Sequence, residues 1–372
     1  MGGKRLSTKS ISKERFIYLD FIKVLAIYFV CFFHYNNFNM NFLSNPSMLT
    51  YLSYFINGIA SAGVPLFFMV NGALLLNRDY NLKKHIKKTI TITALTVVWA
   101  IITLLILSQI NGSSYSISGF FKALWKLELG TLSHLWFLQA LVCIYILYPL
   151  IKEVYDIEDK KVLNYILVVT FIFTFGNVLL NMLVNTLASI LGINYLAINR
   201  FNFFNDFNVF RGFYAYSLVY FIIGAKLLEK LRDDMKINVK QIIIIFTIGI
   251  SILFLYGVMM SNSSKEIYDN VWNGYDTIMT LLVSISIFIL SYVAKNKLDK
   301  VSGIIQLIGE NTLGIYFIHR MVGSALKPYY ITLTFSTNIL SNLIFGLIVM
   351  AISFMITLVL KRIPIIELLF KI

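Results

Sequence analysis

The chain has 372 residues, of which 58% are hydrophobic and only 13% are charged, and its formal net charge is +14. Soluble domains average about 25% charged residues, so the composition argues against an enzyme with a water-facing surface and indicates a polytopic membrane protein. A basic chain can also bind nucleic acid, and the positions of the charges decide between the two classes.

Apolar segments of spanning length recur along the whole chain, and a helix needs about 20 such residues to cross a bilayer. We therefore predict an all-α polytopic membrane protein with about ten transmembrane helices in a single domain, residues 1–372, which begins with a basic tail at 1–15. The segments lie at about 16–35, 51–76, 89–109, 134–151, 162–183, 211–228, 240–260, 274–294, 303–320 and 338–360.

The basic residues fall unevenly on the two sides that these segments define. One side receives 24 of the 32 Lys and Arg residues and the other side receives seven. Because loops rich in Lys and Arg stay in the cytoplasm, this asymmetry predicts that both termini are cytoplasmic. The excess charge then follows from topology and from attraction to membrane lipids, so we expect no nucleic-acid partner.

The first apolar segment contains three residues that are costly in hydrocarbon, Asp20, Lys23 and His34. Lys23 and His34 are eleven residues apart, which on a helix is three turns plus about 20°, so they share one face at roughly 16 Å along the axis. One interpretation is a polar path through the membrane. The other is that Lys23 pairs with Asp20 and reaches toward the near interface, while His34 marks the far interface.

Three of the four histidines fall on the extracytoplasmic side of this topology. His34 ends the first segment there, His134 begins the fourth and His319 ends the ninth, whereas His85 lies in a cytoplasmic basic loop. The two cysteines lie inside apolar segments and no zinc-ligand spacing occurs, so we predict no metal site.

Short polar motifs appear on the apolar segments in a fixed order. They are Leu19-Asp20 with Lys23 and His34, the run from Pro65 to Phe68 that ends in Asn71-Gly72, the run from His134 to Leu138, and the run from Gly309 through Asn311, Thr312 and Tyr316 to His319. In this order, from about residue 15 to about residue 325, the chain resembles the membrane acyltransferase-3 family. It carries Lys23 where that family usually has Arg, and Asn71 and Thr312 where the family usually has Ser.

The resemblance implies an integral-membrane O-acyltransferase. Such an enzyme would take an acyl group, for which we expect acetyl, from cytoplasmic acetyl-CoA and place it on a hydroxyl of an extracytoplasmic polysaccharide or cell-surface glycan precursor. Acetyl-CoA would be a donor substrate, and no metal is expected. The alternative is a transporter or flippase of a lipid-linked or small anionic substrate, which would use the same buried charges as a path. The Lys-, Ile- and Asn-rich composition favours the plasma membrane of a bacterium.

The expected site residues follow from these motifs and from the topology. The predicted catalytic residues are His34 as general base or transient acyl carrier, Lys23 against developing negative charge, and Asp276, which could orient an imidazole. The donor would contact Lys23, Asn71, Arg78, Lys83 and Lys84. Retention by topology and attraction to anionic lipid could also account for the last three. The acceptor would contact His134, Trp136, Arg211, Tyr316 and His319.

Overall fold

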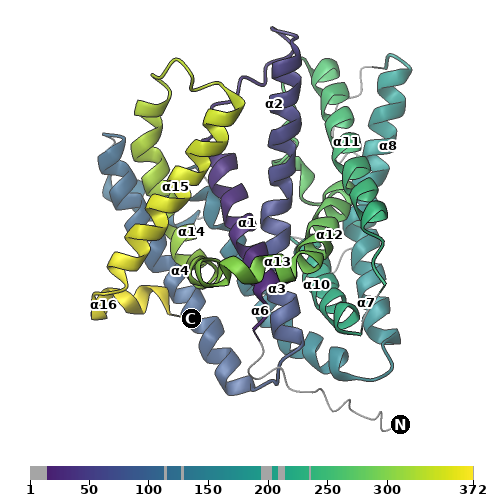
Figure 1. The fold of residues 1–372 in the computed structure, drawn as a ribbon, viewed down its shortest axis with the longest axis vertical. Helices are drawn as coiled ribbons and strands as arrows, with labels where there is room; N and C mark the ends of the chain where they lie inside the picture. Colours follow the sequence, from purple (N-terminus) through teal and green to yellow (C-terminus); the bar gives the residue numbers. More distant parts are fainter. Residues whose placement is uncertain are drawn as a thin grey trace.

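The computed structural model describes residues 15–112, 115–126, 130–193, 203–207, 214–233 and 236–371, and their secondary structure is helical (Figure 1). Each of the predicted segments contains a helix. In chain order these are α1 (Ile17–Tyr35), α2 (Met48–Ile59) continued through η1 (Ala60–Ala62) by α3 (Gly63–Leu76), α4 (Leu82–Ile110), α6 (Trp136–Asp156), α7 (Lys161–Phe171) continued by α8 (Asn177–Ile190), α10 (Tyr216–Arg232), α11 (Val239–Ser264), α12 (Ile278–Val293), α14 (Ser302–Tyr330) and α15 (Ile339–Leu360). Short helices lie between or after them, namely α5 (Ile117–Trp125), α9 (Phe203–Asp206), α13 (Lys295–Leu298) and α16 (Pro364–Glu367).

Eight helical segments of the described chain are long and apolar enough to cross a membrane, so the prediction of a polytopic membrane protein is confirmed. The other two predicted segments are shorter helices, α10 with 17 residues and α12 with 16. The last turn of α10 carries Lys230 and Arg232. α12 begins later than predicted because Thr277 caps it and accepts a hydrogen bond from the backbone N–H of Thr280.

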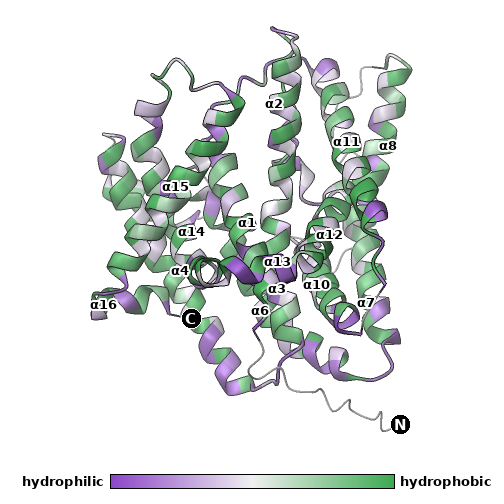
Figure 2. Cartoon of the chain, viewed as in Figure 1, coloured by the Kyte–Doolittle hydropathy of each residue, from purple (hydrophilic) through white to green (hydrophobic). Residues whose placement is uncertain are grey.

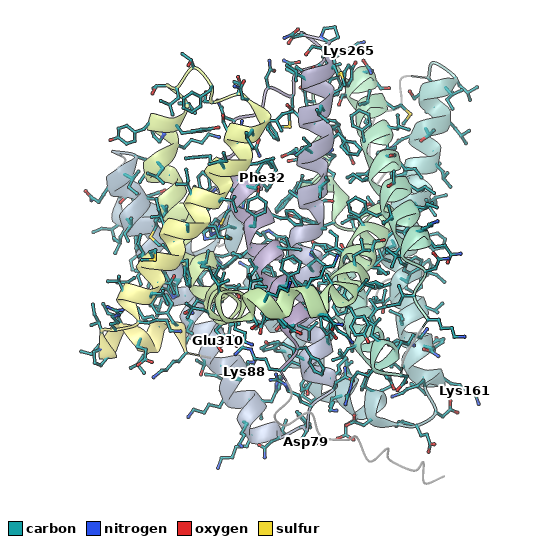
Figure 3. All side chains as sticks on the ribbon, viewed as in Figure 1. Phe32, Asp79, Lys88, Lys161, Lys265 and Glu310 are labelled. Atoms are coloured by element: carbon teal, nitrogen blue, oxygen red, sulfur yellow. The ribbon has the colours of Figure 1, made fainter. Side chains whose placement is uncertain are left out.

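The bundle has polar ends and an apolar middle (Figure 2). Figure 3 labels Asp79 and Lys161 at one end and Lys265 at the opposite end. We call the first the basic end, defined by Arg78, Lys83 and Lys161, and the other the distal end. Because α1 runs from the basic end toward the distal end, its first turns face the basic end and its last turn faces the distal end (Figure 1).

The helix α1 lies in the centre of the bundle and packs against α3, α14 and α15. Gly309 on α14 permits close contact, because a Cβ there would stand 2.9 Å from the Cβ of Asp20. α3 and α10 touch backbone to backbone, since a side chain on Gly72 would overlap the carbonyl oxygen of Phe221. Small residues allow such approaches between membrane helices, and here they fix α1 and α3 against their neighbours.

His85 is buried in α4 and is not part of an exposed basic loop, because Asn81 caps the helix and starts it at Leu82. The Nε2 of His85 donates to the backbone carbonyl of Tyr145 at 2.7 Å. That carbonyl has no helical donor, because the residue four positions later in α6 is Pro149, which has no N–H. His85 therefore completes the backbone hydrogen bonding of a helix that contains proline.

Candidate active site

Asp20 is buried on α1 and accepts a hydrogen bond on each carboxylate oxygen. Lys23 Nζ donates to Oδ1 at 2.6 Å and Arg15 Nε donates to Oδ2 at 2.7 Å. Arg15 also pairs with Glu310 of α14. Lys23 is therefore paired with Asp20, as the simpler interpretation of its position predicted. The two cations and two carboxylates of this group balance in formal charge.

A cavity of about 420 Å³ lies beside this ion-pair group, in the half of the bundle where Figure 3 labels Lys88 and Glu310. Lys23 and Lys88 line it, together with Asn71 and Tyr145, whose hydroxyl donates to Asn71 Oδ1 at 3.2 Å. Lys88 has no ion pair within the described ranges, and its Nζ lies over the ring of Tyr145, 5.5 Å from the ring centre. Ligand pockets in proteins hold roughly 300–1,000 Å³, so this space, the cationic cavity, is large enough for part of a substrate.

A second cavity, of about 20 Å³, lies farther along α1, at the side of His34, His134 and Trp136. Trp272 and Tyr275, from the connection between α11 and α12, complete an aromatic wall around it. This histidine cavity has room for about one water molecule. A substrate group can enter it only if the surrounding side chains move.

His319 joins His34 and His134 to form a group of three imidazoles from distant parts of the chain. The ring centre of His319 lies 5.5 Å from that of His34 and 5.8 Å from that of His134, which belongs to the short helix η2 (Gly130–Leu135). The predicted topology placed these histidines on one side of the membrane, and the structure brings their rings together. Among the described residues no group of three or more His, Cys, Asp or Glu has the arrangement of a metal site.

The hydrogen bond to its neighbour fixes the position of the proton on His319. Its Nδ1 lies 2.5 Å from the carbonyl oxygen of Tyr316, which can only accept, so Nδ1 carries the proton. In the neutral ring Nε2 is then an acceptor, and it is buried without a partner in the described part of the chain. Both ring nitrogens of His134 are also buried without a partner in that part of the chain, and in the neutral ring one of them is a donor and the other an acceptor. Buried polar atoms without partners are rare, and they are expected where a ligand or a water molecule binds.

Phe137 and Tyr316 line both cavities and form the wall between them, which we call the partition. Their ring centres lie 5.5 Å apart in an edge-to-face arrangement, and the Tyr316 hydroxyl donates to the backbone carbonyl of His134. Lys23 and His34 therefore face two separate cavities, and not the single continuous path that one interpretation of their spacing predicted.

The segments that carry the motifs supply Lys23, Asn71 and Tyr316 to the cationic cavity and His34 and His134 to the histidine cavity. A sequence profile of the acyltransferase-3 family, described as an acyltransferase domain, matches residues 16–360. The chain belongs to the acyltransferase-3 family. No curated protein and no solved structure matches it. Because the match runs from the residue before α1 to the end of α15, this acyltransferase domain includes the three histidines and both rings of the partition.

The basic residues that follow α3 lie partly on the surface of the acyltransferase and partly in its interior. Arg78, Lys83 and Lys84 are exposed at the basic end and are not among the residues that line the cationic cavity. Lys88 lies one turn farther into α4 and does line it. Lys88 belongs to the same basic cluster of the sequence, but only Arg78, Lys83 and Lys84 of that cluster were predicted as donor contacts. Its place on the inner face of α4 follows from the burial of His85 three residues earlier, which the prediction of a basic loop did not include.

Asp276 of the acyltransferase lies between η4 (Trp272–Gly274) and α12, outside both cavities. Within the described residues no hydrogen bond joins it to His34. It is close enough to Tyr216 and Tyr220 of α10 to act on them electrostatically. Burial raises the pKa of its carboxyl to about 6. The neighbouring Tyr275, and not Asp276, contributes to the wall of the histidine cavity.

Aromatic side chains form most of the wall on the predicted acceptor side. Trp136 is buried, and its ring centre lies 4.9 Å from that of Tyr214 and 5.5 Å from those of Trp272 and Tyr275. Trp272 and Tyr275 were not predicted, because the connection that carries them has no recognisable motif. Arg211, another predicted acceptor residue, lies outside the described residues.

Proposed function

We propose that this acyltransferase moves an acetyl group from cytoplasmic acetyl-CoA to a hydroxyl of an extracytoplasmic polysaccharide or cell-surface glycan precursor. The observation that carries the proposal is the partition. One wall, formed by Phe137 and Tyr316, separates a cationic cavity from a group of three histidines nearer the distal end. This arrangement fits a donor and an acceptor that approach one point from opposite sides of a membrane.

The distribution of charge supports binding of the acyl donor from the basic end. The positive-inside rule assigns the basic end to the cytoplasm, where acyl-CoA is made. The exposed basic residues of that end would attract the phosphates of coenzyme A over a distance. Lys23 is already paired with Asp20, so Lys88 is the cation best able to bind a phosphate or the thioester end of the donor. Asn71 would meet the amide groups of the pantetheine chain.

The imidazoles support a reaction with the acceptor hydroxyl in the histidine cavity. His34 would take the proton of the acceptor hydroxyl as the hydroxyl oxygen bonds to the thioester carbonyl carbon. The carbon–sulfur bond then breaks, and the coenzyme A thiolate leaves and is protonated. His319 is the second candidate for this proton, because its Nε2 is an acceptor without a partner among the described residues. In an alternative route an imidazole first takes the acyl group and then passes it to the hydroxyl.

The partition places one requirement on either route. The thioester lies on the Lys23 side and the acceptor on the His34 side, so the acyl carbon must reach the wall that Phe137 and Tyr316 form. A cavity with room for about one water molecule cannot hold an acceptor sugar. At least one of the two rings must therefore move when donor and acceptor are bound.

The test uses the protein in proteoliposomes with radiolabelled acetyl-CoA and O-deacetylated envelope polysaccharide from cells that lack the protein. The wild type should release coenzyme A and leave base-labile acetate on the polysaccharide. His34→Ala should lower transfer by about 100-fold or more, the usual loss for a general base. Asn262→Ala, at an exposed position near the distal end of α11, is the control and should transfer at the wild-type rate.

Two results would count against the proposal in different ways. Full transfer by His34→Ala would remove the role of His34 while leaving the reaction in place. No release of coenzyme A and no transfer by the wild type would overturn the proposed reaction, and transport of a labelled anion by the same vesicles would then favour the transporter interpretation.

A further inference from the structure

A third cavity, of about 320 Å³, lies at the distal end, between the α1–α2 connection and the α14–α15 connection. Its lining includes the polar side chains of Asn45, Ser53, Thr337 and Asn338 and the apolar side chains of Leu49 and Ile339. None of the described residues that line it carries a charge. We call it the amide pocket.

Several polar side chains of the amide pocket are free to bind a ligand. Asn45, Ser53, Thr337 and Asn338 make no side-chain hydrogen bond to any other residue that the structure describes. Ser53 is only 3% exposed, so its hydroxyl is largely withdrawn from bulk water although it lines the pocket. Asn45, Thr337 and Asn338 are exposed, so their side chains can exchange bound water for the hydroxyls of a ligand, and Ser53 is the buried member of the set.

The chemistry of this lining favours a neutral sugar. Amides and hydroxyls both donate and accept hydrogen bonds, as sugar hydroxyls require. An anionic ligand would need Lys or Arg, which the lining lacks, and an apolar ligand would leave the amides unpaired. Leu49 and Ile339 offer apolar surface to the C–H face of a sugar ring. The volume lies within the roughly 300–1,000 Å³ of small-molecule sites.

The amide pocket is held close to the last turn of α1. Asn39, which also lines it, follows His34 by five residues, and five extended residues span at most about 18 Å. The chain between them is anchored at Asn36, whose carbonyl accepts from Lys327 Nζ at 2.6 Å and whose Nδ2 donates to Asn57 Oδ1 at 3.2 Å. Figure 1 shows α2 and α15 on either side of α1 at this end. A glycan of a few units could therefore reach from the pocket to His34.

We propose that the amide pocket binds a neutral sugar unit of the acceptor glycan, a few units away from the hydroxyl that receives the acyl group. This inference rests on the proposed function for the identity of its ligand. The pocket holds the chain while one hydroxyl reaches His34. Because the sugar bound there takes no part in bond making, its contacts lower the KM for the glycan and leave kcat unchanged.

The test compares two double variants in proteoliposomes, with acetyl-CoA and O-deacetylated envelope polysaccharide from cells that lack the protein. Asn45→Ala with Thr337→Val removes polar groups from the pocket. Asn262→Ala with Thr332→Val changes the same residue types at the distal end, outside the pocket, and is the matched control. We expect the pocket variant to raise the KM for the polysaccharide about tenfold. Its kcat and its KM for acetyl-CoA should match those of the control.

Three results would overturn this inference. An unchanged KM for the polysaccharide in the pocket variant would show that no sugar binds there. A parallel rise in the KM for acetyl-CoA would show a general disturbance of the structure and no acceptor subsite. No transfer by the wild type would overturn the proposed function, and this inference would fall with the proposed function. The wild type is measured before any variant, so the two failures are distinguishable.

Discussion

Tyr316 donates its hydroxyl proton to the backbone carbonyl of His134, and this hydrogen bond ties α14 to η2, the short helix before α6. The backbone carbonyl of Tyr316 accepts the Nδ1 proton of His319. One residue thus forms half of the wall and also fixes the tautomer of the imidazole behind it. Rotation of the Tyr316 side chain would open the wall without breaking the bond that orients His319.

The partition should select the acyl group by length. Phe137→Ala removes the ring that faces Tyr316 and joins the cationic cavity to the histidine cavity, so longer acyl groups gain space. We expect the ratio of kcat/KM for butyryl-CoA to that for acetyl-CoA to rise about tenfold, in the range expected for two extra methylenes in a pocket. Release of coenzyme A by proteoliposomes measures both values.

Phe175→Ala is the matched control for this prediction, because Phe175 is fully buried in the π-helical segment that joins α7 to α8 and is not among the residues that line the cavities. Both alanine variants should lose about 3–5 kcal/mol of stability, so only selectivity separates them. Phe137→Leu leaves a smaller gap than Phe137→Ala, so its selectivity ratio is measured instead if the alanine variants do not fold. The same selectivity ratio at positions 137 and 175 would contradict the role of the partition.

Lys88 should bind the donor from inside the cationic cavity. Lys88→Gln removes the charge and keeps most of the side-chain length, so we expect the KM for acetyl-CoA to rise at least about tenfold, as for a lost charge-assisted hydrogen bond. Lys87→Gln changes an exposed neighbour and should alter this KM by less than about twofold, and only at low salt, because exposed charges are screened. Equal effects at both positions would indicate a general attraction to the basic end.

The helices could be predicted because hydropathy is a local signal, and each expected segment contains one. The errors occurred where a capping side chain set the start of a helix. Thr277 caps α12 and starts it after the predicted boundary. Asn81 starts α4 early enough to take His85 out of the basic loop and into the interior. A hydropathy window does not contain either of these signals.

The candidate site could be predicted only in part, because side chains meet through helix packing. The topology placed His34, His134 and His319 on one side, but the contact of their rings depends on how α1, α14 and η2 pack. Phe137 and Tyr316 lie in recognised motifs, yet nothing in the sequence predicts that they face each other. The amide pocket likewise joins two connections that are about 290 residues apart in the chain.

His319→Asn should separate the two roles of this side chain. The amide of Asn can still donate to the carbonyl of Tyr316 from the place of Nδ1, but nothing remains at the position of Nε2. If Nε2 handles the acceptor proton, transfer should fall about 100-fold or more, while the midpoint of thermal unfolding stays near that of the wild type. His319→Gln loses the hydrogen bond to the carbonyl of Tyr316, so its midpoint of thermal unfolding should fall below that of the wild type. Full transfer by His319→Asn would leave His34 as the candidate base.

The contact of His85 with α6 predicts a compensating pair of substitutions. His85→Ala leaves the buried carbonyl of Tyr145 without a donor, which should cost about 1–3 kcal/mol of unfolding free energy. Pro149→Ala supplies an N–H four residues after Tyr145, so this carbonyl can pair within α6. The double variant should therefore be more stable than the sum of the two single effects predicts, by about 1 kcal/mol. Denaturant unfolding in detergent measures all four proteins of this cycle, and additive effects would show that His85 does not act through the Tyr145 carbonyl.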